Sequence, residues 1–312
     1  MSFKDSLSSW FLNRSGKYKY YKDNFKKTNK KLNKLKKAYK NKSNKLDESR
    51  NKIKVLKDSQ NNIKNNYETK IDKLEKRLYE KRDFEILQSK IFLNTKELIY
   101  ANVFNDTIRD SKWLKNKNFS LINGAANYSY MYLIYRILND LKPKDILELG
   151  LGQTTNLTSQ YVLNNLDASL LVLENDQNWI DKFSYKMSHI NNVLIKQIPT
   201  ETYIHKSTEN IRYNDIKDSI KDKKFDFILV DGPIGMNQEY PRTNIWDIID
   251  KNLKDDYIII FDDYERNGEK NTVNELLKIL DKNNAEYNVV KYSGINEQFI
   301  ICTEKFKLAL WF

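Results

Sequence analysis

Cysteine and histidine are scarce in this sequence of 312 residues. Cys302 is the single cysteine, so an intramolecular disulfide and a Cys-x-x-Cys metal site are both excluded. His189 and His205 are the two histidines, which argues against a metal site built from several imidazoles. A metal site in this protein would therefore use oxygen ligands.

Long apolar runs are also missing. No stretch of 18 apolar residues occurs, so the sequence predicts no membrane-spanning helix. The N-terminus has neither the apolar core nor the cleavage pattern of a signal peptide. These two absences predict a cytoplasmic protein, with peripheral contact to a membrane as the other location left open.

Positive charge dominates, with a formal net charge of +12, but it is unevenly distributed. Residues 1–95 contain 27 Lys and Arg against 11 Asp and Glu, whereas the remainder contains 27 basic and 31 acidic residues. The second part is mildly acidic, which is unlike a domain that grips a phosphate backbone. Nucleic acid is therefore a disfavoured partner.

Residues 25–95 contain no glycine and no proline, which predicts one long helix. Apolar residues recur at three- and four-residue steps and form a thin, imperfect heptad stripe. Such a helix gains little stability alone in water, so the sequence predicts a coiled coil or a helical hairpin, with a solvated, partly frayed charged helix as the alternative. We expect residues 1–95 to form a basic extension that makes a homo-oligomer or tethers the protein to an assembly complex. The stripe consists of Leu32, Leu35, Tyr39, Leu46, Ile53, Leu56, Ile63, Tyr67 and Leu74.

Residues 1–24 mix large apolar side chains with lysines and arginines, including Trp10, Phe11 and Arg14. This pattern fits an amphipathic helix on an anionic membrane surface. It also fits a short helix that packs on the main domain or on a partner chain, and the second interpretation is favoured.

From residue 145 onward, strand-length apolar runs alternate with helix-length segments, which predicts a parallel sheet covered by helices on both faces. The link 293–296 is too short for a helical crossover, so the last two strands should pair antiparallel. Residues 96–312 should therefore form an α/β, Rossmann-like domain with the seven-stranded sheet of class I methyltransferases. Strands are predicted near 145–149, 169–173, 193–196, 225–230, 257–261, 287–292 and 298–302, and helices near 128–141, 154–165, 176–187, 207–220, 242–252 and 270–283.

The stretch 145–155 predicts a buried strand, a tight turn and the start of a helix. Gly150 and Gly152 let a ligand approach the main chain closely, and Thr154 or Thr155 can cap the helix. The dinucleotide fingerprint requires a third glycine where Thr155 stands, so no pyrophosphate cradle is evident. S-adenosylmethionine (SAM) is favoured over NAD or FAD as the cofactor.

Acidic residues stand at four predicted strand ends. Ligands bind at the carboxyl ends of the strands in such sheets, and an acid after the second strand can bind ribose hydroxyls. The predicted cofactor site contains Glu148, Gly150, Gly152, Thr154, Glu174, Asn175 and Asp231. The other acidic strand end carries Asp262 and Asp263.

Four segments together resemble the plant glucuronoxylan 4-O-methyltransferase family and its microbial relatives in polysaccharide biosynthesis. They are Leu173-Glu-Asn-Asp-Gln-Asn-Trp179, Val230-Asp-Gly-Pro-Ile-Gly235, Pro241-Arg242 and Phe261-Asp-Asp-Tyr-Glu-Arg266. The resemblance covers about residues 119–302 and leaves the N-terminal helix out. It implies methyl transfer from SAM to a sugar hydroxyl, often of a uronic acid, in a polysaccharide or glycan precursor.

The resemblance implies catalytic roles for Asp231, Asp263 and Arg266, whereas Asp262 stands where a histidine is usual. Two mechanisms remain open: Asp231 acts as general base, or Asp231, Asp262 and Asp263 hold Mg, Mn or Ca. Arg242 and Arg266 either bind a carboxylate of an acidic sugar or form structural ion pairs.

Two other functions are weighed. One is a nucleic-acid methyltransferase guided by the basic helix, although the Asn/Asp-Pro-Pro-Tyr type of motif is missing. The other is a coiled-coil adaptor with an inactive methyltransferase-like domain, against which Gly150, Gly152 and Glu174 argue.

Overall fold

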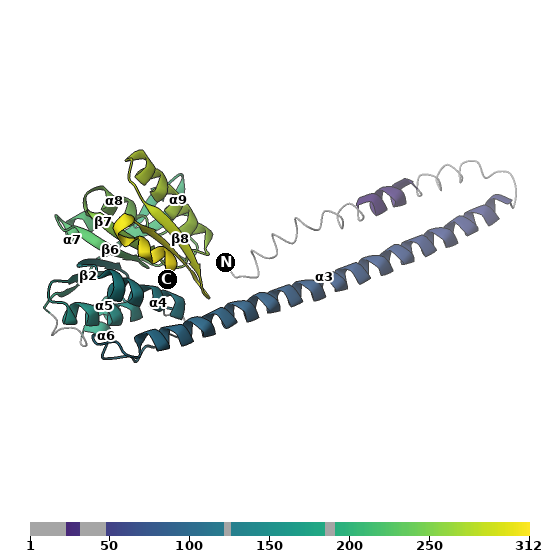
Figure 1. Cartoon of the computed structure of the whole chain (residues 1–312). Coiled ribbons are helices and arrows are strands. Elements are labelled where there is room, and N and C mark those ends of the chain that lie inside the picture. The colour runs from purple at the N-terminus through teal and green to yellow at the C-terminus, as the bar shows by residue number, and fades with distance from the viewer. Residues whose placement is uncertain (1–22, 32–47, 122–125, 185–190) are drawn as a thin grey trace. The chain divides into compact units, whose positions relative to one another are not determined.

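A computed structural model describes residues 23–31, 48–121, 126–184 and 191–312 (Figure 1). These residues belong to two compact units, residues 1–90 and 91–312. The prediction for residues 1–24 falls almost wholly outside the described residues, as does the apolar stripe from Leu32 to Leu46. In the described part of the chain, no helix is both long and apolar enough to cross a membrane.

The N-terminal unit contains a helix over residues 23–31 and most of the helix α3 (Glu48–Ile108). The rings of Phe25 and Tyr67 lie 5.9 Å apart, and Gln60 Nε2 donates to Asn29 Oδ1 at 3.4 Å. These residues bring the two helices into contact, while the coiled coil and the helical hairpin both stay predictions. Leu74, farther along the stripe, is 54% exposed.

The catalytic-domain candidate, residues 91–312, is built on a seven-stranded sheet with the order β3-β2-β1-β6-β7-β9-β8. β9 runs antiparallel to both β7 and β8, while the remaining pairs are parallel. This confirms the predicted Rossmann-like methyltransferase sheet. The strands are β1 (Asp145–Leu149), β2 (Ser169–Glu174), β3 (Val193–Gln197), β6 (Phe225–Val230), β7 (Leu253–Phe261), β8 (Asn288–Ser293) and β9 (Glu297–Cys302).

Helices cover both faces of this sheet (Figure 1). β6 is buried throughout, because successive side chains such as Phe227 and Ile228 point to opposite faces of the sheet and enter the core on each face. One core takes the end of α3, α4 (Tyr128–Arg136), the π-helix Ile137–Leu141, α5 (Gln153–Asn164), α6 (Gln177–Ser184) and the 3₁₀ helix Glu304–Trp311. The other takes α7 (Ile216–Ile220), α8 (Asn244–Lys251) and α9 (Asn267–Lys282).

The prediction of a helix near 207–220 is wrong over the first half of that range. β5 (Thr208–Tyr213) occupies it and pairs with β4 (Thr200–His205) in a separate antiparallel hairpin, and only α7, Ile216–Ile220, is helical. Lys206 and Ser207 both have positive φ, 47° and 67°, which suits a two-residue hairpin turn. The side chains alternate with the period of a strand, so Ile211 is exposed while Asn210 is buried.

Candidate active site

The turn after β1 lies in backbone contact with the turn after β6. Gly150 has φ +98°, a conformation that glycine adopts without strain. A Cβ atom on Gly232 would come within 2.8 Å of the Gly150 nitrogen and 2.5 Å of the Tyr213 hydroxyl. Asp231 N–H also donates to the Leu149 carbonyl at 3.0 Å. The two glycines therefore allow the ends of β1 and β6 to meet and bring Asp231 next to the glycine turn.

Glu148 is fully buried on β1 and faces the first turn of α5. Its carboxylate accepts hydrogen bonds from the hydroxyls of Thr154, Thr155 at 2.9 Å and Thr158 at 2.9 Å. Burial raises the pKa of Glu148 to about 7 against the opposing effect of these three donors. The polar groups of Glu148 and Thr154 are thus directed at each other, and their contact with a cofactor stays a prediction.

Thr155 takes part in the cap of α5, as predicted, but from inside the helix. Gly152 is the N-cap residue, and Thr155 is the third residue of the helix. The Gly152 N–H donates to Thr155 Oγ1 at 3.0 Å, which is one bond of a capping box. The threonine pair is needed inside the helix because both hydroxyls hold Glu148.

Glu174, at the end of β2, links its own loop to the glycine turn. Its Oε2 accepts from Leu151 N–H at 2.9 Å, and its Oε1 accepts from the N–H groups of Asn175 and Asp176 at 2.7 and 2.9 Å. Trp179 donates from Nε1 to the Leu151 carbonyl at 2.6 Å, and its side chain remains 39% exposed. The contacts of Leu151 with Glu174 and Trp179 attach the glycine turn after β1 to the loop after β2. This is the edge of the sheet at which a nucleoside is expected.

The three aspartates at the ends of β6 and β7 come together. Val230 pairs with Phe261 in the parallel register, so the residues that follow them, Asp231 and Asp262, leave the sheet side by side. Carboxylate oxygens of Asp231, Asp262 and Asp263 all lie within 4.8 Å of one another. The prediction that these three acids lie at one edge of the sheet is therefore confirmed.

A buried guanidinium holds the acidic cluster together. Arg242, only 3% exposed, donates from Nη2 to Asp231 Oδ1 at 3.1 Å and to Asp263 Oδ2 at 2.7 Å. Its Nη1 donates to the Asp262 carbonyl at 2.8 Å. Arg266 Nη1 lies 2.7 Å from Asp263 Oδ2 and 3.5 Å from Glu269 Oε1. Of the two roles left open for Arg242, the geometry supports the structural ion pair.

Burial of these carboxylates alters their ionisation. Desolvation raises the pKa of Asp231 to about 6, although Arg242 opposes the shift. The pKa of Asp262 is raised well above its ordinary value, by burial first and then by the charges of Asp231 and Asp263. Arg242 and Asp263 both adopt positive φ, 58° and 62°. Strained backbone of this kind concentrates at functional sites.

A second polar network reaches the cluster from the opposite side and was not anticipated from the sequence. Gln298 on β9 donates from Nε2 to Asp262 Oδ1 at 2.8 Å, and its Oε1 accepts from Ser129 Oγ at 2.8 Å. Asn127 Nδ2 donates to Ser129 Oγ at 2.8 Å and to Glu97 Oε2 at 3.3 Å. Glu97, on α3, also accepts from Tyr128 N–H at 2.5 Å. No local sequence pattern marks these residues, because they meet only through the tertiary fold.

A polar pocket of about 370 Å³ opens over the cluster. The buried Tyr130 hydroxyl has no hydrogen-bond partner among the described residues. Burial first, and then the charges of Asp231 and Asp262, raise its pKa well above the ordinary value. A ligand oxygen or water would satisfy this hydroxyl. The pocket is lined by Glu97, Leu121, Ala126, Asn127, Asp231, Asp262, Asp263, Arg266, Ile295 and Asn296.

The acidic cluster fits a hard divalent cation in part. The donors are all carboxylates, which suit Mg, Mn or Ca. Arg242 donates to one oxygen of Asp231, and Gln298 donates to one oxygen of Asp262. The second oxygen of each acid accepts no hydrogen bond from the described residues. Both oxygens of Asp263 are engaged, by Asn296 and by the arginines. Asp231 and Asp262 are thus the better candidate ligands, and Asp263 is the weaker one.

Comparison with known proteins finds solved structures that resemble this chain at low sequence identity. No protein-family profile and no curated protein sequence matches the chain. A putative caffeoyl-CoA O-methyltransferase from Staphylococcus aureus is 13% identical, covers 70% of this chain and 99% of its own, and has a TM-score of 0.41. An O-methyltransferase from Bacillus cereus in complex with S-adenosylhomocysteine (SAH) is 14% identical, covers 67% of this chain and 91% of its own, and has a TM-score of 0.40. The SAH-bound methyltransferase of Podospora anserina is 15% identical, with coverage of 67% and 86% and a TM-score of 0.40.

Proposed function

We propose that this protein is a SAM-dependent O-methyltransferase. The observation that carries the proposal is the shared position of Asp231, which adjoins the glycine turn on one side and lines the polar pocket on the other. A cofactor on the turn and an acceptor in the pocket would meet at this carboxylate. Strand order supports the same function, because the two turns occupy the ligand-binding edge of the sheet.

The proposed acceptor is a sugar hydroxyl of a polysaccharide or glycan precursor. The resemblance of the segments around Trp179, Gly235 and Arg266 suggests this class of substrate. The pocket supports it physically, because most of its lining side chains carry carboxylate, amide or guanidinium groups that can hydrogen-bond hydroxyls.

The mechanism requires alignment of the acceptor oxygen and removal of its proton. Bound SAM supplies an electrophilic methyl group on its sulfonium. Asp231, with a pKa of about 6, is largely ionised at neutral pH and accepts the proton as general base. Arg242 holds the Asp231 carboxylate through Oδ1 and leaves Oδ2 for the acceptor. If a divalent cation binds, Asp231 and Asp262 hold it, and it lowers the pKa of the hydroxyl.

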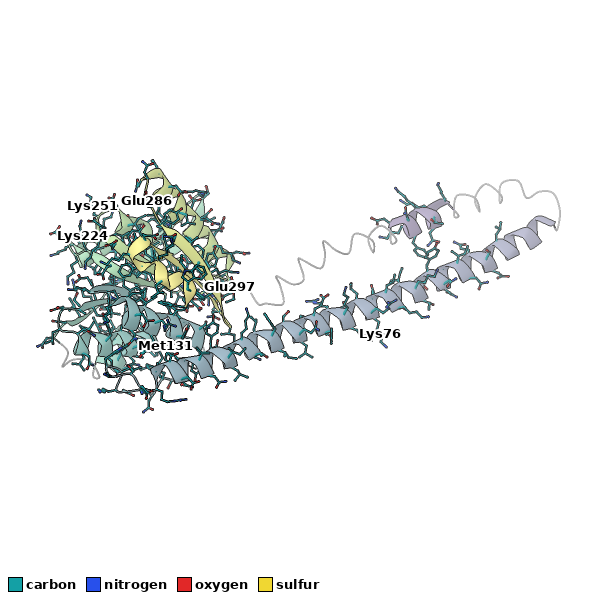
Figure 2. All side chains as sticks on the ribbon, in the orientation of Figure 1. Lys76, Met131, Lys224, Lys251, Glu286 and Glu297 are labelled. Atoms are coloured by element: carbon teal, nitrogen blue, oxygen red, sulfur yellow. The ribbon has the colours of Figure 1, made fainter. Side chains whose placement is uncertain are left out.

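Calorimetric titration with SAM tests the cofactor assignment directly. We expect binding in the wild type, and weaker binding in Glu174→Gln, because the amide cannot accept all the backbone N–H groups that Glu174 accepts. Glu286→Gln is the matched control, because Glu286 is exposed on the link between α9 and β8 (Figure 2). Failure of the wild type to bind SAM would refute the proposal and favour the adaptor.

Methyl transfer tests the catalytic assignment. Mass spectrometry of surface glycans from cells with and without the gene should show a difference of about 14 Da per modified residue, the mass of one CH₂ unit. Asp231→Asn should abolish transfer while retaining SAM affinity. Full activity in this variant would remove Asp231 from the mechanism.

We also propose that the N-terminal unit forms a homo-oligomer. On α3, Leu56, Ile63 and Leu74 are 43%, 45% and 54% exposed, a stripe that a second helix would cover. Light scattering of the whole chain should give a mass above one 37.2 kDa protomer. Leu74→Lys should reduce this mass, and Lys76→Gln, elsewhere on the helix, should not. A monomeric wild type would contradict the proposal.

A further inference from the structure

Negative charge exceeds positive charge around the pocket. Glu97, Asp231, Asp262 and Asp263 line it, and Arg266 is the single cation among its lining residues. With Arg242 counted beneath the floor, four carboxylates face two guanidinium groups. If Asp262 carries a proton, the carboxylates still outnumber the cations.

The two cations are already engaged by protein carboxylates. Arg242 is only 3% exposed and bonds both Asp231 and Asp263, so it cannot turn toward a ligand. Arg266 lies 2.7 Å from Asp263 and 3.5 Å from Glu269 through the same Nη1 atom. A carboxylate on the acceptor would therefore compete with Asp263 and Glu269 for Arg266, and it would add to the four carboxylates that line the pocket.

Groups that suit hydroxyls are present in the same place. Asn296 uses Nδ2 to bond Asp263 at 3.0 Å, and no described residue donates to its Oδ1. Asn296 Oδ1 and the second oxygens of Asp231 and Asp262 can accept hydrogen bonds from sugar hydroxyls.

We propose that the acceptor is a neutral sugar or an amino sugar, and that the pocket rejects uronic acids. This inference rests on the proposed function and narrows its substrate class. An uncharged polyol gains hydrogen bonds from the pocket without adding charge. An ammonium group on an amino sugar offsets the excess negative charge, whereas a carboxylate increases it.

Binding of three matched monosaccharides tests the proposal. Glucosamine, glucose and glucuronate share a ring configuration and carry a positive, a zero and a negative charge. Saturation-transfer NMR with the SAH-saturated whole chain should rank them in that order, both in EDTA and in excess Mg²⁺. SAM calorimetry on the same protein preparation, before SAH is added, separates this test from failure of the proposed function. If SAM binds, glucuronate signals equal to those of glucose, or no signal from any sugar, would overturn the inference.

A charge-removal variant tests the cause of the ranking. Glu97→Gln takes one negative charge from the pocket wall and keeps an oxygen that can accept from Tyr128 N–H. The affinity of glucuronate relative to glucose should rise between about twofold and about fifteenfold, the range for one charge about 10 Å away at water-like and surface-like dielectric constants. Glu286→Gln is the control, because it removes one negative charge from the link before β8. The pocket residues Ile295 and Asn296 lie beyond the other end of β8, in the turn next to Glu297, so the control should leave the ratio unchanged (Figure 2). An unchanged ratio in Glu97→Gln, or an equal rise in the control, would refute the electrostatic cause.

Discussion

Arg242→Met removes the buried cation that holds the acidic cluster. The variant loses the bonds to Asp231, Asp263 and the Asp262 carbonyl, while methionine retains an apolar stem of similar length. Asp231, whose side chain is 34% exposed, is then left without a cation. Asp263 is buried and loses one of its two guanidinium partners, while it keeps Arg266 and Asn296. Breaking a buried ion pair in this way costs about 3–5 kcal/mol of unfolding free energy.

The loss should depend on pH. Asp231 in the wild type already has a pKa of about 6, above its ordinary value of 3.8, and removal of Arg242 raises it further. A carboxyl group whose folded pKa exceeds its unfolded pKa loses stabilising free energy as pH rises between those two values. The deficit of Arg242→Met should therefore be larger at pH 8 than at pH 5.

Urea unfolding followed by tryptophan fluorescence measures this loss. A deficit of about 3–5 kcal/mol corresponds to a midpoint shift of about 1–2 M for a slope of about 2.5 kcal/mol/M. Arg212→Gln is the control, because Arg212 pairs with Glu201 at 2.8 Å and Asp247 at 3.5 Å and is partly exposed. That change should cost at most about 1 kcal/mol. A deficit for Arg242→Met no larger than the control, or one independent of pH, would refute the reasoning.

Three further predictions follow from the glycine turn and the strand-end acids. Glu148→Gln should raise the melting temperature at pH 8 and have less effect at pH 5. The wild-type acid has a pKa of about 7, so it must ionise while buried as pH rises, and glutamine avoids this cost. An equal effect at both pH values in calorimetric scans would contradict this. Gly232→Ala should lower the melting temperature in calorimetric scans, since the new Cβ meets the Tyr213 hydroxyl at 2.5 Å. Gly152→Ala, whose Cβ has no neighbour nearer than 4.0 Å, should leave it nearly unchanged, and equal melting temperatures in the two variants would disprove the steric argument. Titration with Mn²⁺ should show binding in the wild type and at least about tenfold weaker binding in Asp262→Asn, and identical isotherms would exclude that carboxylate as a ligand.

The sheet was predictable because its central strands are buried on both faces. Runs such as Phe225–Val230 and Tyr257–Phe261 are short and almost continuously apolar, and they lack the three- and four-residue spacing of an amphipathic helix. The hairpin at Thr200–Tyr213 was missed because its charged and polar residues also fit the exposed face of a helix. Its turn, at Lys206 and Ser207, contains no glycine or asparagine to signal positive φ.

The candidate site was predictable where strand ends determine it. Asp231, Asp262 and Asp263 follow apolar runs directly, so their shared edge can be read from the sequence. The partners of these acids are different, because Arg242 arrives from a loop and Gln298 from β9. Their contacts depend on packing between distant segments, for which the sequence has no local pattern.

Glu97 ties the pocket to a helix that begins at Glu48. A shortened chain that begins at residue 96, as the predicted domain boundary suggests, would place Glu97 next to the new N-terminus. The first turn of a helix frays because its N–H groups lack intrahelical partners. The pocket wall would then depend on a frayed helix end, although all the residues that line the pocket are retained. A truncated chain should therefore keep at least two helical turns, about eight residues, ahead of Glu97.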